Sequence, residues 1–359
     1  MFVAWRDLRF AKGRFALMGT VIVLITLLVG LLSGLTAGLA RENVSAITGL
    51  PADRLAFAAP PSGQSVSFTN SAVTEEQWRR WSERPGVTAA APLGIRTLNA
   101  AAGDRTAAVS AFGTEPEAGL APVAPGAGRA VLSGSAAGEL DVATGDAVRI
   151  GPLELTVAAV AGDASYSHTP VVWISLDDWQ RLGHNGTTAG EQATVIALRG
   201  DGGADWAAGD RAVGTEARTA EGALTAIGSY QAENGSLQLM RGFLFAISAL
   251  VIGAFFTVWT IQRSGDVAVL KALGASTPYL LGDALGQAVL VLGAGTLLGT
   301  ALAVGIGAVV SGRNVPFVLE PLTVLGPAAV IIVLGVLGAA LSIRRITAVD
   351  PLTALGSAR

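Results

Sequence analysis

The stretch QRSGDVAVLKALGASTPYLLG, residues 262–282, lies between two long apolar runs. Turn-forming residues at 264–265 and 274–278 bracket it, and they predict a short helix over residues 266–273. Two interpretations are open from this stretch alone. It is either a membrane loop that happens to form one helical turn, or a short helix that docks into a partner and transmits force to the apolar segments on both sides.

Individual residues favour the helical interpretation. Asp266 suits the N-terminus of the helix, where its carboxylate accepts free backbone N–H groups, and Gly274 suits the C-terminus. Val267, Leu270 and Lys271 share one face at i, i+3 and i+4 spacing. The choice between the two interpretations depends on the rest of the chain.

The overall composition is that of a membrane protein. Of the 359 residues, 51% are apolar and only 14% are charged, whereas a soluble protein carries about 25% charged residues. The chain contains no cysteine, which excludes disulfides, thiolate metal sites and cysteine nucleophiles.

Four apolar segments are long enough to cross a membrane, since a spanning helix needs roughly 20 apolar residues. Helices are the expected form, because backbone groups in lipid must be hydrogen-bonded internally. The first segment is longer than the 7–15 residues, roughly, of a signal-peptide core, which favours a membrane anchor. The predicted transmembrane helices are residues 15–40, 239–261, 283–311 and 322–343.

The charges predict the orientation of these helices. Segments 1–14, 262–282 and 344–359 together hold nine basic and three acidic residues, whereas 41–238 holds 13 basic and 22 acidic residues. Positively charged segments stay in the cytoplasm. We therefore expect both termini and 262–282 to be cytoplasmic, with 41–238 and the short loop 312–321 outside.

Residues 41–238 read as a mixed α+β domain. Thr74 begins a capping box with Gln77 that predicts a helix start, and the sequence SLDDW at 175–179 reads as the end of a strand followed by a capped helix. The Ala-Pro-Gly-rich residues 118–128 predict a division into two lobes. Strands are predicted at 94–99, 106–112, 129–132, 147–150, 153–160, 171–174 and 193–198.

The predicted fold is thus a membrane α-helical protein with four transmembrane helices and a large extracytoplasmic α+β domain between helices 1 and 2. The N-terminal segment 1–14 is amphipathic, which fits either a helix in the lipid headgroup layer or ordinary flanking positive charge. Gly30, Gly34 and Gly38 form a ladder of small residues. Such a ladder allows another helix, from this chain or from a second copy, to approach closely.

Motifs for catalysis are absent from the sequence. There is no Gly-x4-Gly-Lys-[Ser/Thr] phosphate loop, no His-Glu-x-x-His and no Gly-x-Ser-x-Gly. The two histidines, His168 and His184, are far apart from each other along the chain, and an isolated histidine is more often structural than a metal ligand. We expect neither a metal site nor enzymatic activity in this chain.

Three motifs resemble those of the FtsX-like superfamily of ABC transporter permeases. The most specific is QRSGDVAVLKALGA at 262–275, where Asp266-Val267 stands in place of the family's usual Glu-Ile. DPLTAL at 350–355 resembles the family's tail motif, and residues 145–162 resemble a pattern of its external domain. The resemblance covers essentially the whole chain.

The resemblance implies that 262–282 is a coupling helix seated on a separate cytoplasmic ABC ATPase dimer, which would bind ATP-Mg. It further implies a second copy of the permease, contact with membrane lipid, no nucleic acid, and a multi-pass location in the bacterial inner or plasma membrane. The residues expected to couple to the ATPase are Arg263, Asp266, Val267, Leu270, Lys271, Leu273 and Gly274.

Within the superfamily, Phe255-Phe256 and the sequences of residues 171–182 and 273–287 look most like the haem-exporter branch. This implies efflux of haem, as cargo and not as an intrinsic cofactor, taken from the outer leaflet. Polar residues at the outer helix ends would then hold its polar groups, and Arg41 would pair with a propionate. The candidates are Arg41, Glu42, Tyr230, Glu233 and Met240.

Other interpretations remain open at this level. Each of these candidates fits equally a surface residue that snorkels or caps a helix. The cargo of such a permease could also be lipid-linked, a peptide or a glycolipid. A non-transporting relative would transmit force to an external domain that activates a cell-wall hydrolase.

Overall fold

The chain folds into two compact units in a computed structural model. The sheet unit comprises Leu39–Gly235, and the helical unit comprises Met1–Gly38 with Ser236–Arg359. Each unit is described by itself below. The structure describes residues 12–183, 193–262, 265, 269–271, 273–311 and 315–347.

Four long helices dominate the apolar parts of the chain: α2 (Lys12–Thr48), α8 (Gly228–Gln262), α10 (Thr277–Ser311) and α11 (Pro321–Thr347). Within the described residues, all four are long and apolar enough to cross a membrane. The prediction of four transmembrane helices is confirmed. Helices α2 and α8 extend beyond their apolar segments, so that the end of α2 and the start of α8 belong to the sheet unit.

The helical unit has an apolar core to which all four helices contribute. Phe256 of α8 is almost fully buried, and its ring meets Trp259 edge to face at 6.1 Å between centroids. Trp259 in turn contacts Phe15 of α2. The buried members of this core are Met18, Ile22, Val29, Ile252, Phe256, Trp259, Ala288, Val291, Leu292, Ile331 and Ala339.

The small-residue ladder of α2 is filled by the same chain. A Cβ on Gly30 would come within 2.9 Å of the Ala303 side chain on α10. At Gly34 and Gly38 the neighbours are Phe317 and Pro316, which lie in the loop between α10 and α11. The groups that pack against this ladder in the structure therefore come from the same chain.

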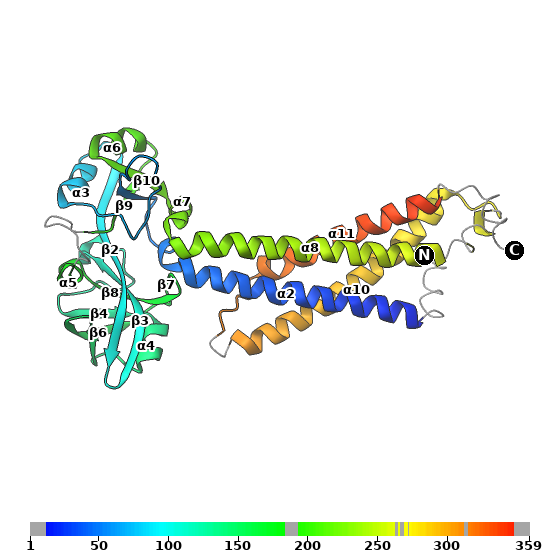
Figure 1. Cartoon of the computed structure of the whole chain (residues 1–359), viewed down its shortest axis with the longest axis horizontal. Coiled ribbons are helices and arrows are strands. Elements are labelled where there is room, and N and C mark those ends of the chain that lie inside the picture. The colour runs from blue at the N-terminus through cyan, green and yellow to red at the C-terminus, as the bar shows by residue number, and fades with distance from the viewer. Residues whose placement is uncertain are drawn as a thin grey trace. The chain divides into compact units, whose positions relative to one another are not determined.

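In its described residues the sheet unit is built on ten strands, whose order is β10-β1-β9-β2-β3-β8-β4-β6-β5, with β7 paired to β8. The long strands β2 and β3 lie side by side (Figure 1). Most neighbours are antiparallel, but β3 with β8 and β4 with β6 are parallel. The bounds are β1 (Arg54–Ala58), β2 (Val87–Ala102), β3 (Arg105–Thr114), β4 (Arg129–Leu132), β5 (Ala147–Ile150), β6 (Leu153–Val160), β7 (Ser165–Tyr166), β8 (Thr169–Ser175), β9 (Val195–Gly200) and β10 (Thr215–Thr219).

This sheet corrects the predicted division into two lobes at 118–128. Strand β3 before that segment pairs directly with β8 after it, from Ser110 opposite Val171 to Thr114 opposite Ser175. The Pro-Gly-rich residues begin with the 3-10 helix η1 (Pro116–Ala118) and lead into β4. They form a loop within one sheet and mark no boundary.

Both faces of the sheet are buried under helices. Neighbouring residues along a strand point to opposite sides, so one strand contributes to both cores. In β1, Ala56 belongs to one apolar core, while Leu55 and Phe57 belong to the other. The helices on the Ala56 face are α3 (Glu75–Ser82), α4 (Gly134–Leu140), α5 (Leu176–Arg181) and α6 (Trp206–Val213). The opposite face is covered by the end of α2, α7 (Ala220–Ala223) and the 3-10 helix η2 (Leu224–Ala226).

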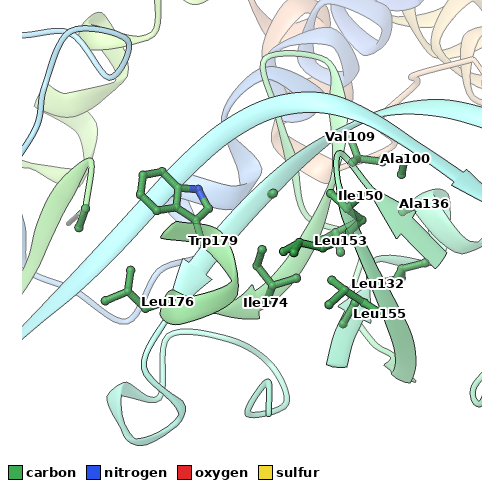
Figure 2. Close-up of a cluster of buried hydrophobic side chains, with 14 of the residues drawn as sticks. Ala100, Val109, Leu132, Ala136, Ile150, Leu153, Leu155, Ile174, Leu176 and Trp179 are labelled. Carbon is green, nitrogen blue, oxygen red and sulfur yellow. The ribbon is translucent and has the colours of Figure 1, made fainter. Parts of the chain in front are cut away.

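Local sequence signals place two of these helices as predicted. Helix α3 begins with the Thr74 capping box, in which Thr74 N–H donates to Gln77 Oε1 at 3.0 Å. Helix α5 begins after Ser175, whose hydroxyl accepts the Asp178 N–H at 3.1 Å. The start of α5 seats Trp179 over the sheet (Figure 2), where a Cβ on Gly113 would meet the tryptophan at 2.3 Å.

Candidate functional site

A tight turn brings polar groups of the sheet unit together. Strands β7 and β8 pair antiparallel and are joined by Ser167-His168, whose φ angles are 51° and 63°. A two-residue hairpin turn with positive φ at both positions favours Asn and Gly, because other residues meet a steric cost there. The turn is held against α2: Ser167 N–H donates to the Asn43 carbonyl at 3.0 Å, and His168 N–H donates to the Glu42 carbonyl at 3.3 Å.

The His168 ring lies between two carboxylates from two helices. Its Nε2 is 2.7 Å from Oε2 of Glu233 on α8, and its Nδ1 is 3.9 Å from Oε2 of Glu42 on α2. The imidazole is 29% exposed and each carboxylate is 44% exposed. The site is therefore open to water, which partly screens interactions between charges there.

Asn43 is the buried centre of this cluster, at 1% exposure. Its Nδ2 donates to Glu233 Oε2 at 3.2 Å and also lies 3.2 Å from His168 Nε2. Its Oδ1 accepts from Ser229 Oγ at 3.0 Å, and Ser229 Oγ is 3.0 Å from Ser167 Oγ. We name Glu42, Asn43, Ser167, His168, Ser229 and Glu233 the His168 cluster.

The five residues predicted to bind the cargo differ in their location and exposure. Glu42 and Glu233 are brought together through His168, as described above. Arg41 is exposed on α2. Tyr230 is half-buried and packs against the apolar core on the α2 face of the sheet. Met240 belongs to the helical unit, where it is 49% exposed.

Asn43, Ser167 and Ser229 were missed by the sequence analysis, which named His168 only as an isolated histidine and expected no site there. The contacts of His168 join residues 65 and 125 positions apart along the chain, so no local pattern links them. The β7–β8 hairpin could not be predicted either, because β7 has only two residues, too few to show the alternation of polar and apolar residues that indicates a strand. His184 lies outside the described residues.

The cluster is not arranged to chelate a metal. The two carboxylates lie at opposite ring nitrogens, which point away from each other, so they cannot share one ion with the imidazole. In the residues that the structure describes, no group of three or more His, Cys, Asp or Glu side chains could hold a metal ion.

The predicted coupling helix ends as its sequence indicates. Gly274 has a φ of 95°, its N–H donates to the Lys271 carbonyl at 3.0 Å, and Ala275 N–H donates to the Leu270 carbonyl at 2.9 Å. These two bonds form a Schellman motif with glycine at the left-handed position. The predicted C-terminus at Gly274 is confirmed.

Other parts of the coupling prediction differ or lie outside the described residues. Gly265 is helical, so it does not form the predicted turn. In the described part of 262–282, Val269 is 55% exposed and Leu273 is 79% exposed, whereas Leu270 and Lys271 are half-buried. The predicted coupling residues Arg263, Asp266 and Val267 lie outside the described residues.

Comparison with protein families matches both parts of the chain. The model of the MacB-like periplasmic core domain matches residues 15–216, and the model of the FtsX-like permease C-terminal region matches residues 239–351. The chain belongs to the MacB-like and FtsX-like permease family. It is therefore an ABC transporter permease of this type, a membrane protein whose relatives are permease subunits.

Two full-length relatives show how this MacB-like permease compares with named proteins. A protein of Staphylococcus haemolyticus, provisionally named hemin transport system permease protein HrtB, is 27% identical over 99% of each chain. An uncharacterized ABC transporter permease of Mycobacterium bovis is also 27% identical over 99% of each chain. The periplasmic region of MacB from Actinobacillus actinomycetemcomitans is 11% identical, with a TM-score of 0.35 over 49% of this chain and 92% of that one.

Proposed function

We propose that this permease is the membrane subunit of an ABC-type efflux pump that exports haem. A separate cytoplasmic ATPase dimer hydrolyses ATP, and the permease, as a pair of copies, releases haem taken from the outer leaflet. The observation that carries the proposal is the similarity, over 99% of both chains, to relatives named hemin transport permease.

Two features support a separate ATPase. The sequence contains no phosphate-binding loop of its own. Beside this, the Gly274 Schellman motif ends a helical segment in which Val269 and Leu273 are exposed. Exposed apolar side chains on a helix are typical anchors for a partner's groove. Arg263, Asp266, Val267, Leu270, Lys271, Leu273 and Gly274 remain the proposed coupling residues.

The charge distribution supports the proposed topology. Nine basic and three acidic residues in 1–14, 262–282 and 344–359 favour a cytoplasmic position for both termini and for the coupling helix. The acidic sheet unit then lies outside. This arrangement places the coupling helix on the side where ATP is available.

The exposure of the five predicted side chains indicates which of them could contact the cargo. Haem is a flat amphiphile whose propionates suit a guanidinium, and Arg41 is exposed on α2. Met240 offers an exposed apolar surface on α8. Glu42 and Glu233 already meet His168, and Tyr230 packs against the core, so these three would shape the site more than contact the cargo directly.

The experiment is haem titration of the purified permease in lipid nanodiscs. We expect a shifted Soret band with wild type and weaker binding with Arg41→Ala. Arg149→Ala is the matched control, because Arg149 is exposed on β5 and has no proposed role. A spectrum that stays that of free haem would discard haem as the cargo and leave a lipid-linked cargo, a peptide or a glycolipid. Stimulation of a cell-wall hydrolase without any transported cargo would favour the mechanotransmitter.

A further inference from the structure

The protonation of His168 Nε2 is fixed by its neighbours. Glu233 Oε2 lies 2.7 Å away and can only accept while it is ionised. Asn43 Nδ2 lies 3.2 Å from both Nε2 and Glu233 Oε2, and its own carbonyl oxygen already accepts from Ser229. All these atoms are satisfied when Nε2–H and Asn43 Nδ2–H both donate to Glu233. An unprotonated Nε2 would instead place its lone pair against the carboxylate.

The other ring nitrogen faces a different carboxylate. Nδ1 lies 3.9 Å from Glu42 Oε2. With Nε2 protonated, Nδ1 of the neutral ring carries a lone pair, which repels that carboxylate. A second proton at Nδ1 makes an imidazolium, which attracts it. The contact between Glu42 and the turn therefore depends on whether the ring is neutral or carries the second proton.

The turn presents the ring in a fixed direction. Ser167 and His168 both have positive φ, a conformation that costs non-glycine residues free energy and persists only where surrounding structure enforces it. Here the backbone bonds to the Asn43 and Glu42 carbonyls enforce it. Residues held in such strained conformations cluster at functional sites.

We propose that the β7–β8 turn is a proton-sensitive clamp, in which the imidazolium of His168 bridges Glu42 on α2 and Glu233 on α8, and the neutral ring keeps only Glu233. Besides His168, the charged and titratable groups on the packed elements of this unit are Arg41 and Glu42 on α2, Tyr230 and Glu233 on α8, and Tyr166 in the hairpin. The clamp rests on the sheet unit alone and does not depend on which cargo is exported.

Tyr166 does not compete with His168 in the neutral range. Its side chain is buried at 7% exposure, and burial raises the pKa of this phenol above its ordinary value. The phenol therefore stays uncharged at neutral pH and adds no charge beside the ring.

Histidine-selective 15N labelling of the full-length protein in nanodiscs tests the clamp. The chain has two histidines, and His184→Gln assigns the signals. We expect Nε2 of His168 to stay protonated from pH 5.5 to 8.5, roughly the range in which imidazole titrates, while Nδ1 gains its proton on acidification. In Glu42→Gln the Nδ1-protonated fraction at about pH 6.5 should fall about twofold, as expected for loss of a partly exposed ion pair.

Glu139→Gln is the matched control, because Glu139 is exposed on α4 of the same unit. It should leave the Nδ1-protonated fraction unchanged. Two results would overturn the clamp: a neutral ring that carries its proton on Nδ1, or a response to Glu42→Gln no larger than the response to Glu139→Gln.

Hydrogen exchange gives a second readout that does not require assignment of the ring. The Ser167 and His168 amides donate to α2, so a closed clamp should slow their exchange at acidic pH several-fold more than the intrinsic rate predicts. His168→Gln should abolish that extra protection, whereas His184→Gln should retain it. Equal protection in wild type and His168→Gln at acidic pH would contradict the proposal.

Discussion

The ring of Phe317 occupies the space that a side chain on Gly34 would fill: a Cβ on Gly34 would lie 2.3 Å from Phe317 Cζ. The adjacent Val318 N–H donates to the Gly34 carbonyl at 3.1 Å. On α10, a Cβ on Gly307 would lie 2.4 Å from the same ring. The loop between α10 and α11 is therefore anchored between α2 and α10, where Gly34 and Gly307 leave room for the Phe317 ring.

Gly307→Ala should destabilise the protein, because its added methyl group meets the Phe317 ring. Overpacking of this kind costs about 1–3 kcal/mol, and a lower thermal unfolding midpoint in detergent would show it. Gly305→Ala is the matched control on the same helix, since nothing lies within 4 Å of a Cβ there. Alanine is the better helix former, so the control should lose no stability.

The double variant Gly307→Ala with Phe317→Ala tests the contact itself. Removing the ring creates space for the new methyl group, so the two losses in stability should be less than additive. Strictly additive losses would show that Gly307 matters for a reason other than Phe317.

Leu273→Asp should weaken the association with the partner ATPase at least tenfold. Leu273 is 79% exposed at the end of the proposed coupling helix, so a carboxylate there costs the fold little, but on binding it would have to be desolvated in the apolar groove of the partner. Copurification of tagged permease with its ATPase measures the loss, and Leu273→Met is the conservative control. Undiminished copurification of the aspartate variant would remove Leu273 from the coupling surface.

Asn43→Ala should destabilise the sheet unit by about 1–3 kcal/mol, the usual cost of leaving buried hydrogen-bonding partners unsatisfied. The side chain is 1% exposed and bonds both Ser229 and Glu233. Asn99→Ala on β2 is the control, because Asn99 is exposed and such changes usually stay within about 0.5 kcal/mol. Thermal unfolding of the full-length variants compares the two, and equal losses would refute a central role for Asn43.

Glu115→Gln should stabilise the protein at neutral pH. Partial desolvation of the Glu115 carboxyl raises its pKa above its ordinary value of 4.5, although the residue as a whole is exposed, and repulsion by Glu117, Glu75 and Asp177 raises the pKa further. The unfolded state therefore ionises first as the pH rises through 4.5, so this group lowers the stability of the wild type from that pH upward. Glutamine cannot ionise and avoids the loss.

The pH dependence supplies the control for this variant. The difference in unfolding midpoint between Glu115→Gln and wild type should grow from pH 4.5 towards neutral and vanish well below pH 4.5, where the carboxyl is protonated in both states. Because Glu115 is exposed, the difference should be small. A difference that persists unchanged at acidic pH would show that charge is not its cause.

Local signals explain what the sequence predicted well. The transmembrane helices follow from the length of apolar segments, and the starts of α3 and α5 follow from side chains that cap within three residues. The helix end at Gly274 could be predicted because few residues other than glycine tolerate its φ of 95°. Each of these features depends on residues close together in the chain.

Long-range pairing explains what the sequence predicted poorly. Strand β2 has 16 residues, Val87–Ala102, although only 94–99 were predicted, because its alanine-rich ends have low strand propensity and are held by β9, β3 and β5. The lobe boundary at 118–128 was wrong for the related reason that a loop's composition does not reveal which strands pair across it. Glu42 and Glu233 were predicted from their positions at helix ends, but His168, which joins them, was not.

Helix α2 supplies Met18 and Ile22 to the core of the helical unit and Ala46 and Ile47 to a core of the sheet unit. Any soluble fragment made for crystallography or antibody selection must therefore keep the last turns of this helix, and the start of α8 that bonds Asn43. A fragment trimmed to the strands alone would expose an apolar sheet face to water, and we expect it to aggregate.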